Sequence, residues 1–133
     1  MHVLQNNEHY YYKSDLKEVK LPNIPKYERL YVSLSGGVDS MVLISILHAH
    51  KYKLHALHIN YNNRSEAQDE KQFLEKWCYL HNIQFDVLNI SVKRSDTSRD
   101  YYEKYTNKLR YDFYKKYSSF ILLGHHKNDI IEN

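Results

Sequence analysis

The chain has 133 residues, a formal net charge of +3 and a hydrophobic fraction of 42%. This length can bury one hydrophobic core, and this composition is typical of a folded domain rather than a disordered segment. So small a charge permits a nucleic-acid partner without requiring one. The single cysteine, Cys78, excludes an internal disulfide and any cysteine-rich metal site within the chain.

No stretch approaches the roughly 18 consecutive apolar residues of a membrane-spanning helix. The first residues, MHVLQNNEHYYYK, lack the apolar segment of a signal peptide. Together with the single cysteine, these features predict a cytoplasmic protein with no membrane partner. Residues 1–28 are polar and tyrosine-rich and contain both prolines, so we expect an irregular extension there and a folded domain over residues 29–133.

Apolar runs alternate with helical patterns through the expected domain. The apolar runs predict strands over residues 29–34, 54–60, 84–90 and 120–124. Residues 39–50 predict a helix that is too apolar on all sides to face water. Strands alternating with helices are typical of an α/β fold, in which a parallel sheet carries helices on both faces.

Two further helices complete the pattern. Ser65 is expected to cap the first of them, in which one inward face repeats at i, i+3, i+4 and i+7. That face consists of Leu74, Trp77, Cys78 and His81. The second helix is expected from about Asp100 to Tyr117, and its core face consists of Tyr101, Tyr105, Leu109 and Phe113. A second, polar face of this helix consists of Glu103, Asn107 and Arg110, which recur at i, i+4 and i+7.

Polar motifs follow three of the predicted strands, at residues 35–40, 58–64 and 124–132. In open parallel sheets, ligands bind beyond the carboxyl ends of the strands. We therefore expect the functional site at that edge of the sheet. Doubly wound domains usually have a larger sheet than these strands supply, so we expect the domain to be incomplete at its C-terminal end.

The segment SGGVDS joins the first predicted strand to the first helix. Gly36 and Gly37 allow positive φ and leave backbone N–H groups uncovered for an anion, next to the positive end of a helix. The hydroxyls of Ser35 and Ser40 can donate to phosphate oxygens, whereas Asp39 would repel phosphate unless a divalent metal lies between them. The loop thus predicts a polyphosphate site with Mg²⁺. An ordinary turn capped by Asp39 or Ser40 is the alternative.

The segment matches neither a Walker A loop nor the dinucleotide G-x-G-x-x-G pattern. It resembles the pyrophosphate-binding loop of the PP-loop ATP pyrophosphatases, which cleave ATP between its α- and β-phosphates. The resemblance implies an adenine nucleotide alpha hydrolase-like fold, with ATP and Mg²⁺ as cofactors. The ATP contacts that it implies are Ser35, Gly36, Gly37, Val38, Asp39, Ser40, His58, Asn60 and Gly124.

Three further segments resemble the tRNA(Ile)-lysidine synthetase branch of that family. The segment HINYNNR supplies His58, Asn60 and Arg64, and Tyr61 stands where a second histidine is common. The segment EKYTNKLRY supplies Glu103, Arg110 and Tyr111, and Thr106 and Asn107 replace an Ala-Arg pair. The segment LGHHKNDIIEN supplies Gly124, His125, His126, Asp129 and Glu132, and Asn128 and Asn133 replace an Asp and a Thr.

This branch adenylates the C2 carbonyl of the wobble cytidine in the tRNA anticodon loop, and the ε-amine of free lysine then displaces AMP. The catalytic residues implied for this chain are Asp39, Arg110, His125 and Asp129. The implied contacts to lysine or tRNA are Arg64, Glu103, Arg110 and Glu132. Asp39 and Asp129 are the implied Mg²⁺ ligands. Read without the resemblance, the two histidines and Asp129 would also suit a zinc site.

Positive charge is concentrated between Lys93 and Lys116, where eight Lys/Arg and four Asp/Glu give 8 − 4 = +4. Interleaved tyrosines make this stretch suited to single-stranded RNA, through phosphate contacts and base stacking. An ordinary solvated helix is the alternative reading.

Other functions remain open. A related ligase could act in tRNA thiolation or make a small-molecule amide, although sulfur transfer fits poorly with a single cysteine on a packed helix face. A degenerate paralogue that binds ATP or RNA without turnover is a further alternative, because Asn107 and Asn128 depart from the pattern. A homodimer is also left open.

Overall fold

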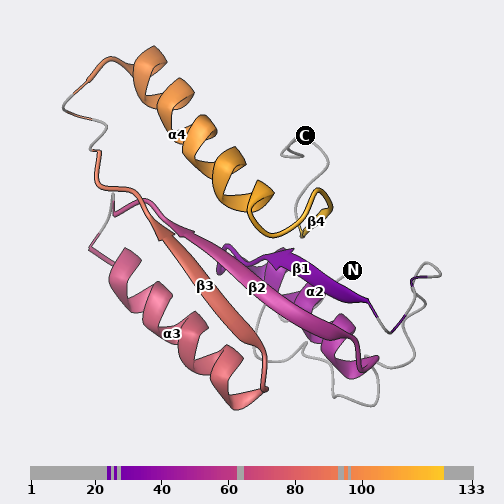
Figure 1. The fold of residues 1–133 in the computed structure, drawn as a ribbon. Coiled ribbons are helices and arrows are strands. Elements are labelled where there is room, and N and C mark those ends of the chain that lie inside the picture. The colour runs from indigo at the N-terminus through magenta and orange to yellow at the C-terminus, as the bar shows by residue number, and fades with distance from the viewer. Residues whose placement is uncertain are drawn as a thin grey trace.

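The computed structural model describes residues 24, 26, 28–62, 65–92, 95 and 97–124. They form, in order, β1 (Arg29–Ser33), α2 (Val38–Ala49), β2 (Lys53–Asn60), α3 (Ala67–Leu80), β3 (Gln84–Asn89), α4 (Arg99–Lys115) and β4 (Ile121–Leu123) (Figure 1). The structure confirms every predicted strand and helix, and the ends of the elements shift by at most two residues. Among the described helices, none is long and apolar enough to cross a lipid bilayer.

The described strands form one parallel sheet in the order β3-β2-β1-β4. Val32 in the middle of β1 lies opposite Ala56 of β2 and Leu122 of β4. The chain therefore moves outward from β1 through β2 to β3, and then returns to the other side of β1. The order of the strands reverses between β1 and β4, which makes the carboxyl ends of these two strands the topological switch point.

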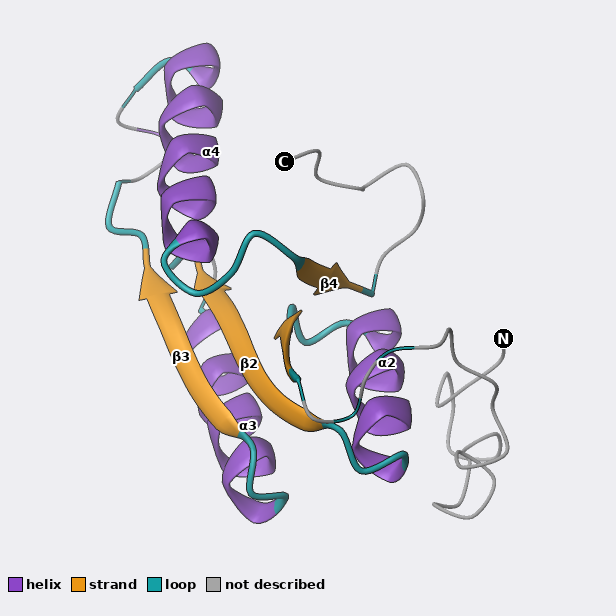
Figure 2. Cartoon of the chain, turned by 45° about the vertical axis from the view of Figure 1, so that its right-hand side comes forward, coloured by secondary structure: helices purple, strands orange, loops and turns teal. Residues whose placement is uncertain are grey.

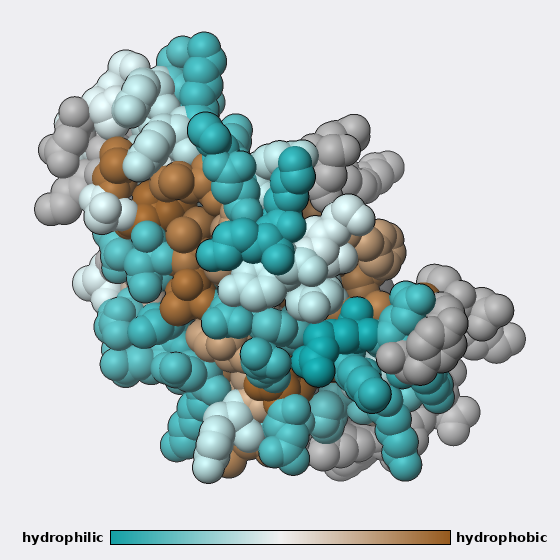
Figure 3. Space-filling model, in the orientation of Figure 1, coloured by the Kyte–Doolittle hydropathy of each residue, from teal (hydrophilic) through white to brown (hydrophobic). Residues whose placement is uncertain are grey.

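Helices cover both faces of this sheet, as the alternating pattern predicted. On one face, Val32 packs in a cluster with Leu47 of α2 and Leu74 of α3. On the other face, Leu57 packs against Phe113 and Tyr114 near the end of α4. Figure 2 shows that the rest of α4 rises past the arrowheads of β2 and β3. In Figure 3, apolar surface gathers beside α4 on an otherwise mainly hydrophilic face.

Two local predictions were wrong. Ser65 does not cap α3, because its hydroxyl donates to the carboxylate of Glu66 at 3.0 Å and the helix begins without a side-chain cap. Tyr101 does not belong to the core, since it lies on the part of α4 beyond the sheet and is 55% exposed. Instead its ring stacks on Tyr105, with the two centroids 5.8 Å apart. The first turn of α4 is capped by Ser98, whose Oγ accepts from the backbone N–H of Tyr101.

Candidate functional site

The loop after β1 is held in shape by its own two serines. The backbone N–H of Ser35 donates to Oγ of Ser40 at 3.1 Å, and that hydroxyl donates to the carbonyl of Gly37 at 3.1 Å. Because the single proton of Ser40 is used in this way, Oγ of Ser35 donates to Oγ of Ser40, 3.1 Å away, and accepts from the N–H of Gly37. Ser40 is buried. Its hydroxyl therefore stabilises the loop through hydrogen bonds, and the predicted contact between Ser40 and phosphate stays a prediction.

The donors left for an anion are backbone amides. Val38 and Asp39 open α2, and the first N–H groups of any helix have no intrahelical acceptor. Both residues are exposed, and the positive end of the helix dipole lies at the same place. Of the two glycines that allow positive φ, Gly36 adopts it, with a φ of 91°, whereas Gly37 has an ordinary φ of −76°.

Gly124 lies against the backbone at the start of α2. A Cβ atom at this position would lie 2.6 Å from the carbonyl oxygen of Asp39 and 2.7 Å from Cα of Ser40. Only glycine allows the end of β4 to approach the loop so closely. The structure thus assigns Gly124 a packing role at the switch point, and the predicted contact with ATP stays a prediction.

His58 and Asn60 lie at the carboxyl end of β2 and are buried. The Nδ1–H group of His58 donates to the carbonyl of Leu34 at 2.8 Å, which ties β2 to the residue that precedes the loop. Burial lowers the pKa of His58 from its usual value. Asn60 donates to Asn89 and accepts from the backbone N–H of Asn62, so its side chain holds the turn after β2. Their predicted role in ATP binding remains untested.

Arg110 is brought to the same edge of the sheet by α4. Its Nη1 donates to the hydroxyl of Tyr61 at 3.3 Å, and its Nη2 donates to Oδ1 of Asn107 at 3.0 Å. Tyr61 directly follows β2, so the guanidinium lies where that strand ends. Glu103, from the same predicted face, is exposed and pairs with Arg99 at 3.0 Å. Sequence reasoning did not identify Tyr61 as a site residue, although it had marked it as a departure from the family pattern.

Much of the positive charge on α4 is neutralised locally. Ion pairs at i, i+4 join Arg99 to Glu103, Lys104 to Asp100 and Lys108 to Asp112. These pairs are already counted in the net charge of +4, which therefore rests on the other basic residues of the segment, among them Arg110, Lys115 and Lys116.

Several predicted site residues lie outside the described part of the chain. They are Arg64, His125, His126, Asp129 and Glu132. The described residues contain no group of three or more histidine, cysteine or acidic side chains that could hold a metal ion. Asp39 alone stands in the first turn of α2, where a carboxylate also favours the helix dipole. The predicted Mg²⁺ ligand pair and the alternative zinc site thus remain predictions.

Cys78 is fully buried on the inward face of α3, as predicted. Burial raises the pKa of its thiol to about 12. The thiolate is the reactive form of cysteine, so this side chain is an inert part of the core.

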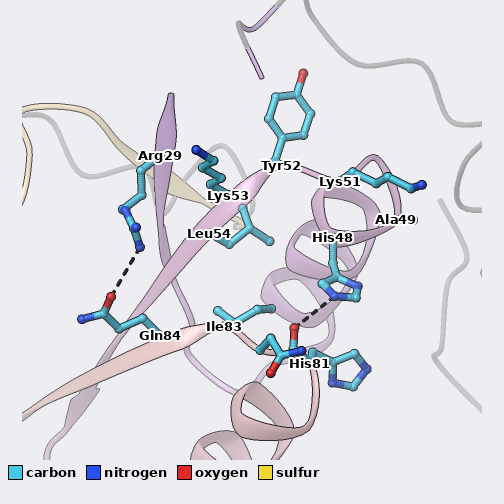
Figure 4. Close-up of a pocket in the computed structure, with 11 residues that line it drawn as sticks. Arg29, His48, Ala49, Lys51, Tyr52, Lys53, Leu54, His81, Ile83 and Gln84 are labelled. Carbon is cyan, nitrogen blue, oxygen red and sulfur yellow. Dashed lines mark hydrogen bonds between the residues drawn. The ribbon is translucent and has the colours of Figure 1, made fainter. Parts of the chain in front are cut away.

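A hollow of about 610 Å³ lies at the opposite edge of the sheet from the loop. It is lined by the amino ends of the strands and the carboxyl ends of α2 and α3, as Figure 4 shows. Arg29 reaches Gln84 there, and Nε2 of His48 lies 3.2 Å from the carbonyl of His81. His48 and His81 are basic residues at the carboxyl ends of α2 and α3, where they complement the helix dipole.

The fold and the loop together define the class: a doubly wound α/β domain with a glycine-serine-aspartate loop at its topological switch point. A family model described as the PP-loop domain matches residues 8–133, and the chain belongs to that family. This result confirms the resemblance that the loop predicted.

Similar proteins agree with this assignment. The tRNA(Ile)-lysidine synthase of Mycoplasmopsis pulmonis is 32% identical over 106 residues, which cover 76% of this chain and 35% of that protein. The synthase of Thermotoga maritima is 32% identical over 116 residues, covering 79% of this chain and 28% of that protein. This chain thus spans about a third of the length of these relatives. A solved U34-tRNA thiolase of Methanococcus maripaludis shares the fold, with a TM-score of 0.57 and 19% identity over 77% of this chain and 40% of the other.

Proposed function

We propose that this chain provides the ATP-binding site of a tRNA-modifying ligase that attaches lysine to the wobble cytidine of tRNA(Ile). The observation that carries the proposal is the geometry of the loop at the switch point. The backbone amides of Val38 and Asp39 lie in the first turn of α2, and a hydrogen bond between Ser35 and Ser40 stabilises the loop. Gly124, at the end of β4, packs against the start of the helix. The lysidine synthases at 32% identity supply the choice of reaction.

In the proposed reaction the C2 carbonyl oxygen of cytidine attacks the α-phosphorus of ATP, and pyrophosphate leaves. The ε-amine of lysine then attacks C2, and AMP leaves with the oxygen. The loop amides would bind the pyrophosphate as its charge develops. Arg110 would lie near the phosphates, because it is fixed to Tyr61 at the end of β2.

Mg²⁺ fits one feature of the described site. Asp39 is an exposed carboxylate among phosphate-binding donors, and such a group is compatible with bound phosphate when a hard cation lies between them. Asp39 would hold the ion, which would supply charge neutralisation for the leaving pyrophosphate. Asp129 is proposed as the second ligand and His125 as a group that stabilises charge near the reacting phosphate. Glu132 and Arg64 are proposed to contact lysine or tRNA.

The exposed beginning of α4 is proposed to contact the anticodon loop. Tyr101 and Tyr105 form a nearly parallel pair, with 7° between the ring planes, and nucleobases stack on such surfaces. Replacing Tyr101 by alanine should weaken binding of an anticodon stem-loop about tenfold, since stacking of one base contributes on the order of 1–3 kcal/mol. Tyr79→Ala is the matched control, because Tyr79 is 79% exposed but lies on α3. Equal loss in both variants would contradict this contact.

The test of the function is transfer of radiolabelled lysine to unmodified tRNA(Ile) by this chain with ATP and Mg²⁺. Lysine incorporation accompanied by release of AMP and pyrophosphate is the expected result. Pyrophosphate release that needs tRNA but not lysine, with no lysine incorporated, would show that the acceptor is a molecule other than lysine. ATP binding without any release would favour the non-catalytic alternative instead.

A further inference from the structure

Among the described residues, the side chains that contact the guanidinium of Arg110 are neutral. Arg110 is only partly exposed, and both hydrogen bonds of its guanidinium go to uncharged oxygens, on Tyr61 and Asn107. Within the described residues no carboxylate lies within ion-pair distance of it, whereas Lys104 and Lys108 of the same helix each have one. Partly buried charges usually acquire a counter-charge, so the guanidinium is placed to meet an anion.

The helix that carries Arg110 is anchored one turn later. The hydroxyl of Tyr114 lies 2.6 Å from Oγ of Ser33, the last residue of β1. Burial raises the pKa of Tyr114, so this hydroxyl remains protonated and keeps its hydrogen bond at neutral pH. Arg110 is therefore held at the carboxyl ends of β1 and β2, the edge of the sheet from which the loop also begins. Its two contacts with described residues use only part of the N–H donors of the guanidinium, and the proposal assigns the others to an anion.

The two oxygens that hold Arg110 come from the two described segments in which this chain departs from the lysidine-synthetase pattern. Tyr61 replaces a common histidine after β2, and Asn107 replaces an arginine on α4. These positions are 46 residues apart (107 − 61 = 46), yet both side chains contact the same guanidinium. An arginine at position 107 would add a second positive charge beside Arg110, whereas asparagine adds an acceptor. The departures therefore act together on one side chain.

We propose that Tyr61 and Asn107 are positioning residues that hold Arg110 toward the phosphates of ATP. This inference rests on the proposed function for the identity of the anion. The inference itself is that Tyr61 and Asn107 are coupled to ATP binding through Arg110. Removing the oxygen of either residue leaves the guanidinium free to move and weakens binding of Mg²⁺-ATP. Asn107 is then a functional residue of the site in this chain and not a sign that catalytic activity has been lost.

The first experiment measures the guanidinium itself, without activity. Side-chain NMR of ¹⁵N-arginine reports how fast the Nη groups of Arg110 rotate, with Arg110→Lys assigning the signal. Tyr61→Phe, which removes one hydroxyl, should speed this rotation. Tyr105→Phe is the control, because it removes a hydroxyl from the same helix that holds no part of Arg110. Unchanged rotation in Tyr61→Phe would overturn the proposal.

The second experiment measures binding of Mg²⁺-ATP by calorimetry. Tyr61→Phe and Asn107→Ala should each weaken binding about three- to tenfold, the usual worth of one hydrogen bond, and their effects should not add because they act through one side chain. Asn107→Asp is the sharpest variant. It keeps the acceptor, so Arg110 should stay ordered, but it supplies a carboxylate that competes with ATP, so affinity should still fall.

The outcomes separate the two proposals. If the parent chain binds no Mg²⁺-ATP, the proposed function fails and this inference fails with it. If the parent binds and Arg110→Ala weakens binding, while Tyr61→Phe and Asn107→Ala leave it unchanged, the inference alone is wrong. A thermal melt of each variant accompanies the titration, and a loss of affinity without a loss of stability assigns the effect to positioning.

Discussion

The three glycines of the chain should respond to replacement by alanine in three different ways. At Gly124 the added Cβ would lie 2.6 Å from a backbone oxygen and 2.7 Å from a backbone Cα. Ordinary contacts begin near 3.4 Å, so β4 or the start of α2 must move by several tenths of an ångström. Such overpacking costs typically about 1–3 kcal/mol, and the lower entropy of the unfolded alanine chain returns roughly 0.4–1 kcal/mol.

The other two glycines provide matched comparisons. At Gly36 the φ of 91° strains any residue with a Cβ, so Gly36→Ala should cost roughly 1–2 kcal/mol although the nearest atom is 3.8 Å away. At Gly37 the backbone is ordinary, and a Cβ would meet only Oγ of Ser35, at 3.5 Å. Alanine is less favourable than glycine at this N-cap position, but the lower entropy of the unfolded alanine chain offsets part of that cost, so Gly37→Ala should lower the free energy of unfolding by less than about 1 kcal/mol.

Urea denaturation followed by circular dichroism measures all three changes. Gly124→Ala should lower the unfolding free energy by about 1–2 kcal/mol, and the melting temperature by roughly 4–8 °C for a domain of this size. Gly37→Ala should keep most of the stability but weaken Mg²⁺-ATP binding, because its methyl group narrows the space in which phosphate would approach the loop. A Gly124→Ala variant as stable as the parent would contradict the close packing at Gly124, and so would a Gly37→Ala variant destabilised as strongly as Gly124→Ala.

Three further predictions concern the scaffold. Because the pKa of His58 is lowered in the folded state, its contribution to stability should be complete above the unfolded pKa of 6.5 and should decline as the pH falls below that value. His58→Asn keeps an N–H donor for the carbonyl of Leu34 and should remove this part of the pH dependence in urea titrations. Cys78 should resist a thiol-reactive dye in the native chain at pH 8 and react only on unfolding, and rapid native labelling would contradict its burial. Ser98→Ala should cost about 1 kcal/mol in thermal melts through loss of the cap on Tyr101, whereas Thr97→Ala should cost almost nothing.

Local patterns were sufficient to predict the elements and the loop. Periods of two and 3.6 residues identify strands and helices because they report which side chains are buried together. The SGGVDS motif located the loop because this combination of glycine, serine and aspartate rarely occurs by chance between a strand and a helix. Ser65 was wrongly taken as a cap since a neighbouring carboxylate, on Glu66, offered its hydroxyl another acceptor.

What the sequence could not supply was the arrangement of distant segments. The contact between Tyr61 and Arg110 joins residues 49 positions apart and depends on how far α4 extends past the sheet. The same extension exposes Tyr101, which a helical period alone had placed in the core. The packing role of Gly124 depends on β4 lying beside β1, and the alternation of strands and helices does not determine strand order.

The choice between an amine and a sulfur acceptor cannot rest on the fold, because the U34-tRNA thiolase shares it at 19% identity. It rests on the side chains that each chemistry needs. Sulfur transfer through persulfides requires a cysteine that ionises near neutral pH, and a cysteine-ligated cluster requires several. The only cysteine of these 133 residues is fully buried, and its pKa is raised to about 12. An amine brings its own nucleophile and needs no thiol from the protein, which is why the proposed function takes lysine as the acceptor.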